Sequence, residues 1–234
     1  MELIENLIKI GFTRHESILY LTLCKEGELS GYEAAKISGI PRSNAYLALS
    51  GLVEKGGAWK IESEVIRYAA VPIDELTANL RREYYHTLEY LSAHVPERDE
   101  LTKPFFSITG EIQVINKVKY IIENAAQRIY LSLDQSELNL LKVELSQALQ
   151  RGLKVVLLIE QPIKLDGAII YLKDANQSGQ IRLIADSAEV LTGEFEIGGK
   201  ANCIYSKNIN LVKLIKDSLT NEIKLIQINH SRNK

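Results

Sequence analysis

The chain has 234 residues, of which 46% are hydrophobic, and its formal net charge is −2. This length suits one large or two ordinary domains with a proper core. A charge near zero excludes a polycation, so any nucleic-acid binding must depend on a local patch. Two cysteines far apart in the chain predict buried thiols, not a disulfide framework or a metal site. The acidic N-terminus and the lack of a long apolar run predict a cytoplasmic protein without a signal peptide or membrane span.

The first 72 residues predict a winged helix-turn-helix domain. Thr13 and Glu16 have the spacing of a capping box and begin a helix over 13–26. Ser30 caps a short second helix, and Pro41 occupies the first turn of a third, which runs to about residue 55. The runs "AWKIES" and "VIRYAAV" then predict a small hairpin. Helix, short helix, tight turn, helix and hairpin are the plan of a winged helix, whose third helix enters the major groove.

The N-terminal end of the predicted third helix carries polar residues that suit DNA contact. Arginine can bind guanine with two hydrogen bonds, asparagine can pair with adenine, and hydroxyl and backbone N–H groups suit phosphate. The region 36–67 holds five basic and three acidic residues, which is modest local support. The same residues are also ordinary helix-start chemistry. The predicted DNA-binding residues are Arg42, Ser43, Asn44, Tyr46, Lys55, Lys60 and Arg67.

Residues 73–95 predict a long helix with a narrow apolar seam, close to that of a coiled coil. Such a seam needs a partner. It pairs either with the chain's own C-terminal domain or with the same helix of a second subunit, and we favour the dimer because it would set the spacing of two DNA half-sites. The polar segment 96–104, with a proline at each end, is the predicted linker. The seam residues are Ile73, Leu76, Leu80, Tyr84, Leu88, Leu91 and Val95.

Three stretches of this N-terminal region resemble the TrmB family of transcriptional regulators. They are the opening "GFTRHESILYL", the turn and helix "SGIPRSNAYLAL", and "YAAVPIDEL" after the hairpin, and together the resemblance covers roughly residues 3–77. It implies a dimeric winged-helix regulator whose third helix reads an operator. By the same resemblance, Arg42, Ser43, Asn44 and Tyr46 belong to the DNA-facing helix.

Residues 105–234 alternate strands and helices, which predicts an α/β domain with a mixed sheet. The family resemblance implies that this part is similar to the phospholipase-D-like fold and serves as an effector or dimerisation module. Segment 167–176 suits either helix or strand. The last segments predict a helix over about 207–221 and a possible strand over 222–229. The earlier elements are strands at 105–109, 128–134, 154–160, 180–186, 188–196 and 200–206, with helices at 110–126 and 136–152.

We expect no catalytic site, cofactor or metal in this second domain. Enzymes of the phospholipase-D-like fold use a His-x-Lys-x4-Asp motif, and none of the four histidines begins one. Asp134, Glu160 and Asp186 end strands, where ligands gather in open α/β sheets, so a polyol, an amine or a cation could bind there as an effector. The three acids are equally explained as turn and cap residues. The longer C-terminal region that forms the sugar site of sugar-sensing relatives is not expected here, which puts a sugar effector in question.

The sequence thus predicts a homodimeric, sequence-specific DNA-binding transcriptional regulator with a C-terminal sensor domain and a small-molecule effector. One alternative is a protein-interaction module whose winged helix does not read DNA. The other is an unorthodox enzyme in the C-terminal domain.

Overall fold

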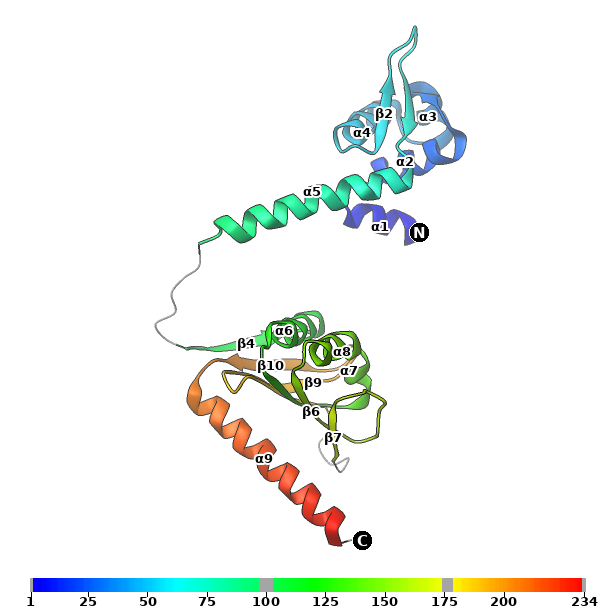
Figure 1. Cartoon of the computed structure of the whole chain (residues 1–234). Helices are drawn as coiled ribbons and strands as arrows, with labels where there is room; N and C mark the ends of the chain where they lie inside the picture. The colour runs from blue at the N-terminus through cyan, green and yellow to red at the C-terminus, as the bar shows by residue number, and fades with distance from the viewer. Residues whose placement is uncertain (1, 97–102, 174–178, 233–234) are drawn as a thin grey trace. The chain divides into compact units, whose positions relative to one another are not determined.

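The computed structural model describes residues 2–96, 103–173 and 179–232, and the chain divides into two compact units, residues 1–98 and 99–234 (Figure 1). The predicted fold class is confirmed: a winged helix-turn-helix, a long helix, and a C-terminal α/β unit with a mixed sheet. The predicted linker falls mostly on residues outside the described ones. Within the described residues, no helix has the length and apolar character needed to cross a membrane.

The N-terminal unit follows the predicted order and adds a first helix that the sequence pattern did not indicate. The capping boxes at Thr13 and Ser30 are both present, so the starts of the second and third helices are set locally. The short strand β1 pairs with β3, and β3 pairs with β2, to make a three-stranded sheet. Its elements are α1 (Glu2–Lys9), α2 (Arg14–Glu26), β1 (Leu29–Ser30), α3 (Gly31–Ser38), α4 (Arg42–Glu54), β2 (Ala58–Ile61), β3 (Arg67–Ala70) and α5 (Ile73–His94).

One apolar core holds this unit together. Leu19 and Leu23 of α2 meet Leu49 and Leu52 of α4, and all four are buried. Full burial of such a side chain contributes about 1.5–3 kcal/mol. The core therefore fixes which face of α4 turns inward, and with it which face solvent reaches.

The long helix α5 divides into a packed start and a free remainder. Leu76 is buried in the core of its own unit and Leu80 packs partly against it, whereas every residue from 81 to 95 is exposed. This corrects the predicted seam, because Leu76 already has an intramolecular partner. The seam residues that remain exposed are Ile73 and, further along the helix, Tyr84, Leu88, Leu91 and Val95.

The C-terminal unit is a seven-stranded sheet in the order β4-β10-β9-β8-β5-β6-β7, parallel only in β5–β6 and β6–β7. Helices α6 and α8 cover one face, and α9 packs on the other (Figure 1). Its elements are β4 (Phe105–Thr109), α6 (Glu111–Asn124), β5 (Arg128–Ser132), α7 (Gln135–Asn139), α8 (Lys142–Gln150), β6 (Lys154–Ile159), β7 (Ile169–Leu172), β8 (Gln180–Ala185), β9 (Glu189–Phe195), β10 (Ala201–Ser206) and α9 (Ile209–Arg232).

The structure resolves or corrects three sequence-based expectations for this unit. The undecided segment contains strand β7, the helix expected at 136–152 is the pair α7 and α8, and the strand expected at 222–229 is wrong because α9 continues through it. Ile223 and Leu225, two residues apart, show the spacing expected of a strand. However, Ile215, Leu219, Ile223 and Ile226 recur at helical spacing and pack against the sheet, which favours the helix. The predicted burial of both thiols holds for Cys203 but not for Cys24, which is exposed.

Candidate nucleic-acid interface

The N-terminal end of α4 projects its polar residues outward. Gly39, in a left-handed conformation with φ 71°, ends α3, and the buried Ile40 and the exposed Pro41 lead into α4. Arg42, Ser43 and Asn44 are all exposed. In the described part of the chain, no side chain accepts a hydrogen bond from the first-turn N–H groups of α4. These N–H groups and the helix dipole make this end suitable for a phosphate.

Two tyrosines frame this end of α4. The Arg42 guanidinium lies over the ring of Tyr32, with 4.3 Å between the guanidinium carbon and the ring centroid. A stacked guanidinium has less freedom than an isolated arginine side chain, so Tyr32 orients it. Tyr46 is half exposed and its ring lies against Gly31, where a Cβ atom would overlap the ring. The start of α3 therefore supports the side chains at the start of α4.

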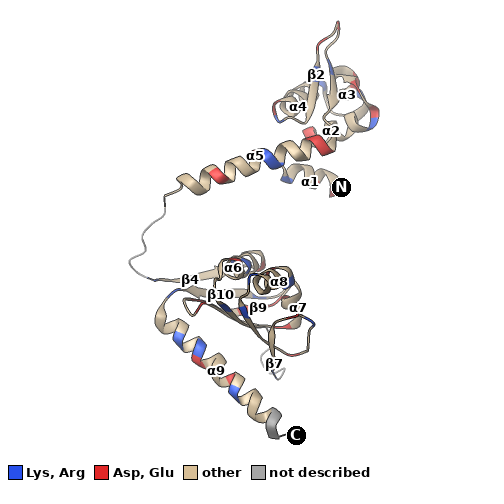
Figure 2. Ribbon diagram, in the orientation of Figure 1, with Lys and Arg blue, Asp and Glu red and all other residues tan. Residues whose placement is uncertain are grey.

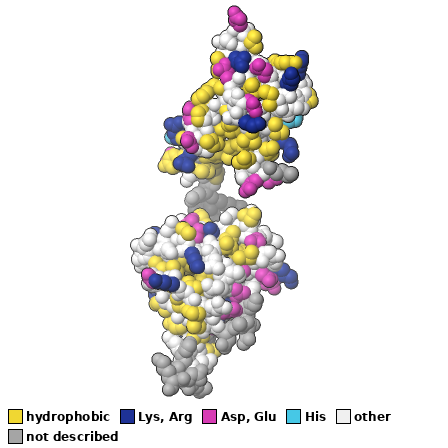
Figure 3. Space-filling view, turned by 90° about the vertical axis from the view of Figure 1, so that its right-hand side faces the viewer, with side chains coloured by type: hydrophobic (Ala, Val, Ile, Leu, Met, Phe, Trp, Pro, Cys, Tyr) yellow, Lys and Arg dark blue, Asp and Glu magenta, His cyan; other side chains and the backbone are white. Residues whose placement is uncertain are grey.

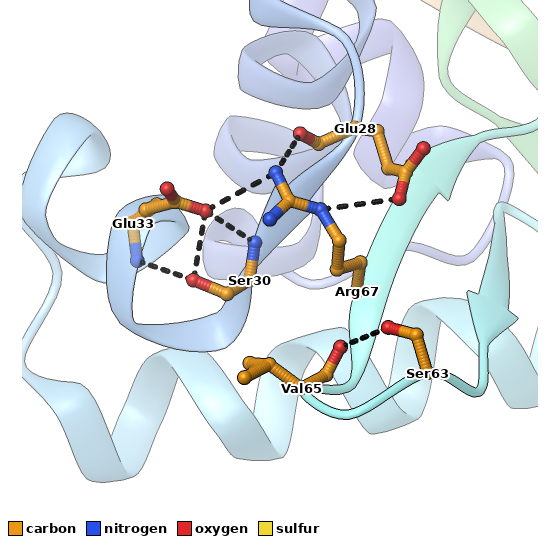
Figure 4. A network of polar contacts seen from close by, with 6 residues as sticks. All are labelled: Glu28, Ser30, Glu33, Ser63, Val65 and Arg67. Carbon is orange, nitrogen blue, oxygen red and sulfur yellow. Dashed lines mark hydrogen bonds and ion pairs between the residues drawn. The ribbon is translucent and has the colours of Figure 1, made fainter.

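Arg67 joins the hairpin to the start of α3 (Figure 4). Its Nη2 donates to the Glu28 carbonyl at 2.9 Å and lies 3.5 Å from Glu33 Oε2, and its Nε lies 3.1 Å from Glu28 Oε1. The N–H and the hydroxyl of Ser30 hold the pKa of Glu33 below its ordinary value, with a smaller contribution from Arg67. The Arg67 side chain is 36% exposed, but its guanidinium already has carboxylate partners within the N-terminal unit.

Lys55 also turns toward its own unit. Its ammonium lies 2.6 Å from Glu16 Oε2 and donates to the Gly11 carbonyl at 2.9 Å. Glu16 is buried and accepts a hydrogen bond from the Thr13 N–H at 2.7 Å as part of the capping box. The pair therefore links the C-terminal end of α4 to the start of α2. Both charged groups stabilise the unit itself, and the ammonium of Lys55 is already engaged.

The tip of the hairpin is acidic (Figure 2). Lys60 is exposed and lies 3.2 Å from Glu62, and Glu64 follows in the same turn. Carboxylates at this tip would repel a phosphate backbone. Of the seven predicted contacts, the structure gathers Arg42, Ser43, Asn44 and Tyr46 at one end of α4 and places the three cations elsewhere.

The structure separates the three acids that were predicted to form an effector site. Because β8 is antiparallel to β5, Asp186 follows β8 at the edge where β5 begins. There its carboxylate accepts three N–H bonds of 2.8 Å, from Ala126, Gln127 and Arg128. Burial raises the pKa of Asp186, but these bonds outweigh it and hold the pKa below its ordinary value. Asp186 is therefore a turn residue, and its predicted place beside the other two acids is corrected.

Asp134 and Glu160 do share an edge, since they follow the parallel strands β5 and β6. The sequence reasoning missed Lys173, which follows the third parallel strand β7 and lies 3.5 Å from Asp134 Oδ1 with a side chain only 4% exposed. Among the residues that the structure describes, Asp134 Oδ1, Lys173 Nζ and Gln135 Oε1 are buried and find no hydrogen-bond partner. The same rule that selected the acids, a polar residue after an apolar strand, would have found Lys173 had β7 been recognised as a strand. No group of three or more acids, histidines and cysteines suited to a metal occurs in the described ranges.

Comparison with known proteins defines the class of this chain as a DNA-binding transcriptional regulator. Residues 7–74 match the family model "Sugar-specific transcriptional regulator TrmB", and residues 105–208 match "Transcriptional regulator TrmB, EBD N-terminal subdomain". The two matches together span most of the chain. The protein belongs to the TrmB-like family of winged-helix transcriptional regulators.

Two relatives have similar sequences. "Uncharacterized protein YrhO" of Bacillus subtilis strain 168 is 28% identical over 236 residues, with 97% of this chain and 86% of that protein covered. The "HTH-type sugar sensing transcriptional regulator TrmBL1" of Pyrococcus furiosus is 28% identical over 136 residues, with 56% of this chain covered. The second alignment spans only 40% of TrmBL1.

Likenesses to solved structures are slighter. They include TrmBL2, described as an archaeal chromatin protein with a novel mode of DNA binding, at 19% identity and a TM-score of 0.44, covering 94% of this chain and 96% of that one. NucT of Helicobacter pylori has 11% identity and a TM-score of 0.43, covering 53% of this chain and 97% of that one. Nuc of Salmonella typhimurium, a phospholipase D family member, has 16% identity and a TM-score of 0.42, covering 52% and 94%.

Proposed function

We propose that this regulator is a homodimer that binds a specific operator through the exposed end of α4 and responds to a small molecule in its C-terminal unit. One observation carries the DNA-binding part. In a chain of this family, Arg42, Ser43 and Asn44 are exposed together at a helix start that no described side chain caps. That surface offers a bidentate donor, an amide and free N–H groups to a duplex.

The test begins with selection of genomic fragments that the full-length protein binds, followed by affinity measurements against salt. Binding to the selected site should weaken steeply as salt rises, because phosphate contacts release counterions. Arg42→Ala should weaken it by about 1–3 kcal/mol and relax one base position. The matched control is Lys25→Ala, which removes a cation 82% exposed at the end of α2 and should leave the base preference intact.

An interaction module that does not read DNA is the main alternative. It predicts weak binding to every fragment with no base preference, and the selection would then return unrelated sequences. An unorthodox enzyme in the C-terminal unit is the second alternative, and we propose that this unit is not catalytic. Phosphodiesterase turnover by purified protein would contradict that proposal.

The dimer is proposed on the exposed part of α5. Tyr84, Leu88, Leu91 and Val95 recur at steps of four, three and four, and between 47% and 63% of each side chain is exposed. A groove of about 510 Å3 between α5 and the rest of the unit includes Leu80 and Tyr84 in its lining, so apolar surface continues from the seam. Figure 3 likewise shows hydrophobic side chains gathered on the surface of the N-terminal unit. Apolar surface of this extent is typical of an interaction site.

Sedimentation of two charge variants tests the dimer. Leu88→Glu places a carboxylate on the seam and should produce monomers. Ala93→Glu places the same charge on the opposite side of the helix and should leave the dimer intact. A dimer that survives the first change would show that the contact lies elsewhere.

The effector is proposed at the edge formed by Asp134, Glu160 and Lys173. Asp134 Oδ1 and Lys173 Nζ lie 3.5 Å apart, but neither makes a hydrogen bond to the described residues, and a ligand with hydroxyl or amine groups would supply one. TrmBL1 is named as a sugar-sensing regulator, so simple sugars and polyols are the first compounds to test. Binding there would shift the population of arrangements of the two DNA-binding heads.

Thermal shift with a panel of sugars, polyols and polyamines would identify a ligand. Lys173→Met should abolish any such shift, and Lys164→Met is the matched control. A ligand that stabilises both variants equally would exclude this edge as its site.

A further inference from the structure

Leu47 occupies the outer face of α4, although leucine is a residue type most often found in a core. Its side chain is 75% exposed, the highest value among the large hydrophobic residues described as exposed. Ala45, Ala48, Leu49 and Leu52 form the buried side of the same helix. Leu47 therefore stands opposite the core, one turn beyond Ser43.

The neighbours of Leu47 on this face are small and polar. Ser43 and Ser50 lie one turn before and after it, and both are exposed. Short side chains on both sides allow a duplex to come close to the helix while the isobutyl group reaches furthest. The first acidic residue of α4 is Glu54 at its far end, so no carboxylate in the first three turns opposes that approach.

An apolar group on a base-reading face has a defined counterpart in DNA. In the major groove, each base pair presents hydrogen-bond donors and acceptors, and the apolar group is the 5-methyl of thymine. A protein partner would instead favour a contiguous apolar patch. The serines on each side of Leu47 interrupt such a patch along this face.

We propose that Leu47 reads the 5-methyl group of a thymine in each operator half-site. The contact rests on the proposed operator binding and specifies one more base than the polar residues do. The methyl of 5-methylcytosine occupies the same place in the groove, so Leu47 would also accept a methylated cytosine at that position.

Deoxyuridine scanning tests this contact, because deoxyuridine lacks only the methyl group of thymidine. Each thymine of one selected half-site is replaced in turn, and binding of the full-length protein is measured at fixed salt. One position should lose about fourfold in affinity, the effect of removing one buried methyl group. Leu47→Ala should bind the original site several-fold more weakly and should no longer distinguish thymine from deoxyuridine. Leu47→Met, which keeps an apolar chain, should retain that distinction.

Two results would overturn the inference while leaving operator binding intact. Either no thymine position responds in the wild-type protein, or Leu47→Ala keeps the full response. Failure of the proposed function looks different, since no fragment would then be bound selectively by any variant. Thermal unfolding followed through Trp59 checks that each variant is folded. Because Leu47 is exposed, the unfolding midpoint of each Leu47 variant should equal that of the wild-type protein.

Discussion

Substitution of Lys55 by methionine should destabilise the winged-helix unit without removing a DNA contact. The ammonium of Lys55 is 2.6 Å from Glu16, whose side chain is 6% exposed. Methionine keeps most of the length and the apolar stem of the lysine, so the change removes little except the charge. Glu16 would then keep its bond from the Thr13 N–H and lose its cation.

The magnitude follows from the burial of the two partners. Removing one partner of a fully buried ion pair costs about 3–5 kcal/mol, because the remaining charge is left uncompensated. Lys55 is 39% exposed, so water can reach part of the carboxylate in the variant. We therefore expect about 1–3 kcal/mol, near the cost of leaving a buried polar group unsatisfied. For a unit of this size, the melting temperature falls by about 4–8 °C per kcal/mol.

The chain has one tryptophan, Trp59 in β2, so its fluorescence reports unfolding of this unit alone. Lys25→Met is the control, since Lys25 is 82% exposed and forms a surface pair with Glu26 that should contribute less than about 1 kcal/mol. The slope of operator affinity against salt should be unchanged in the Lys55 variant. An unchanged melting curve together with a slope reduced by about 0.9 for each subunit bound would refute the reasoning, and Lys55 would then be a phosphate contact.

Three further changes test the site and its scaffold. Gly31→Ala should displace the Tyr46 ring, because its Cβ would overlap that ring. The loss of free energy of operator binding should exceed the loss of free energy of unfolding measured through Trp59. Asp186→Asn keeps a residue type that tolerates φ 52° and removes a carboxylate whose pKa is below its ordinary value. That carboxylate stabilises the C-terminal unit above about pH 4, and its contribution disappears as the pH falls toward the lowered pKa. Circular dichroism of the variant should therefore show lower stability at neutral pH and a weaker dependence on pH below 4. Gly193→Ala should cost about 1–3 kcal/mol in urea unfolding, because its Cβ would overlap the backbone of the neighbouring strand at Asn202.

The winged-helix unit was predictable because its signals are local. Capping boxes at Thr13 and Ser30 and the proline before Arg42 mark helix starts by hydrogen bonds and dihedral limits that span only a few residues. The exposure of Arg42, Ser43 and Asn44 follows from the same helical period that buries Leu49. That period also places Leu47 on the exposed side of α4.

Other features depended on groups far apart in the chain. Lys55 was predicted to face DNA, yet its nearest carboxylate is Glu16, 39 residues earlier. Asp186 resembled the other strand-ending acids, but the direction of β8 carried it to the opposite edge. A local pattern indicates that a strand exists and does not indicate which way it runs beside its neighbour.

The sequence by itself determined the starts of α2, α3 and α4, the polar N-terminal end of α4 and the alternation of strands and helices in the C-terminal unit, because backbone hydrogen bonds and side-chain periodicity act within a few residues. Only the tertiary structure decided which cations are already paired, which part of α5 is exposed and which polar groups share an edge of the sheet. Those outcomes depend on which distant segments pack together, and burial and strand direction are properties of that packing.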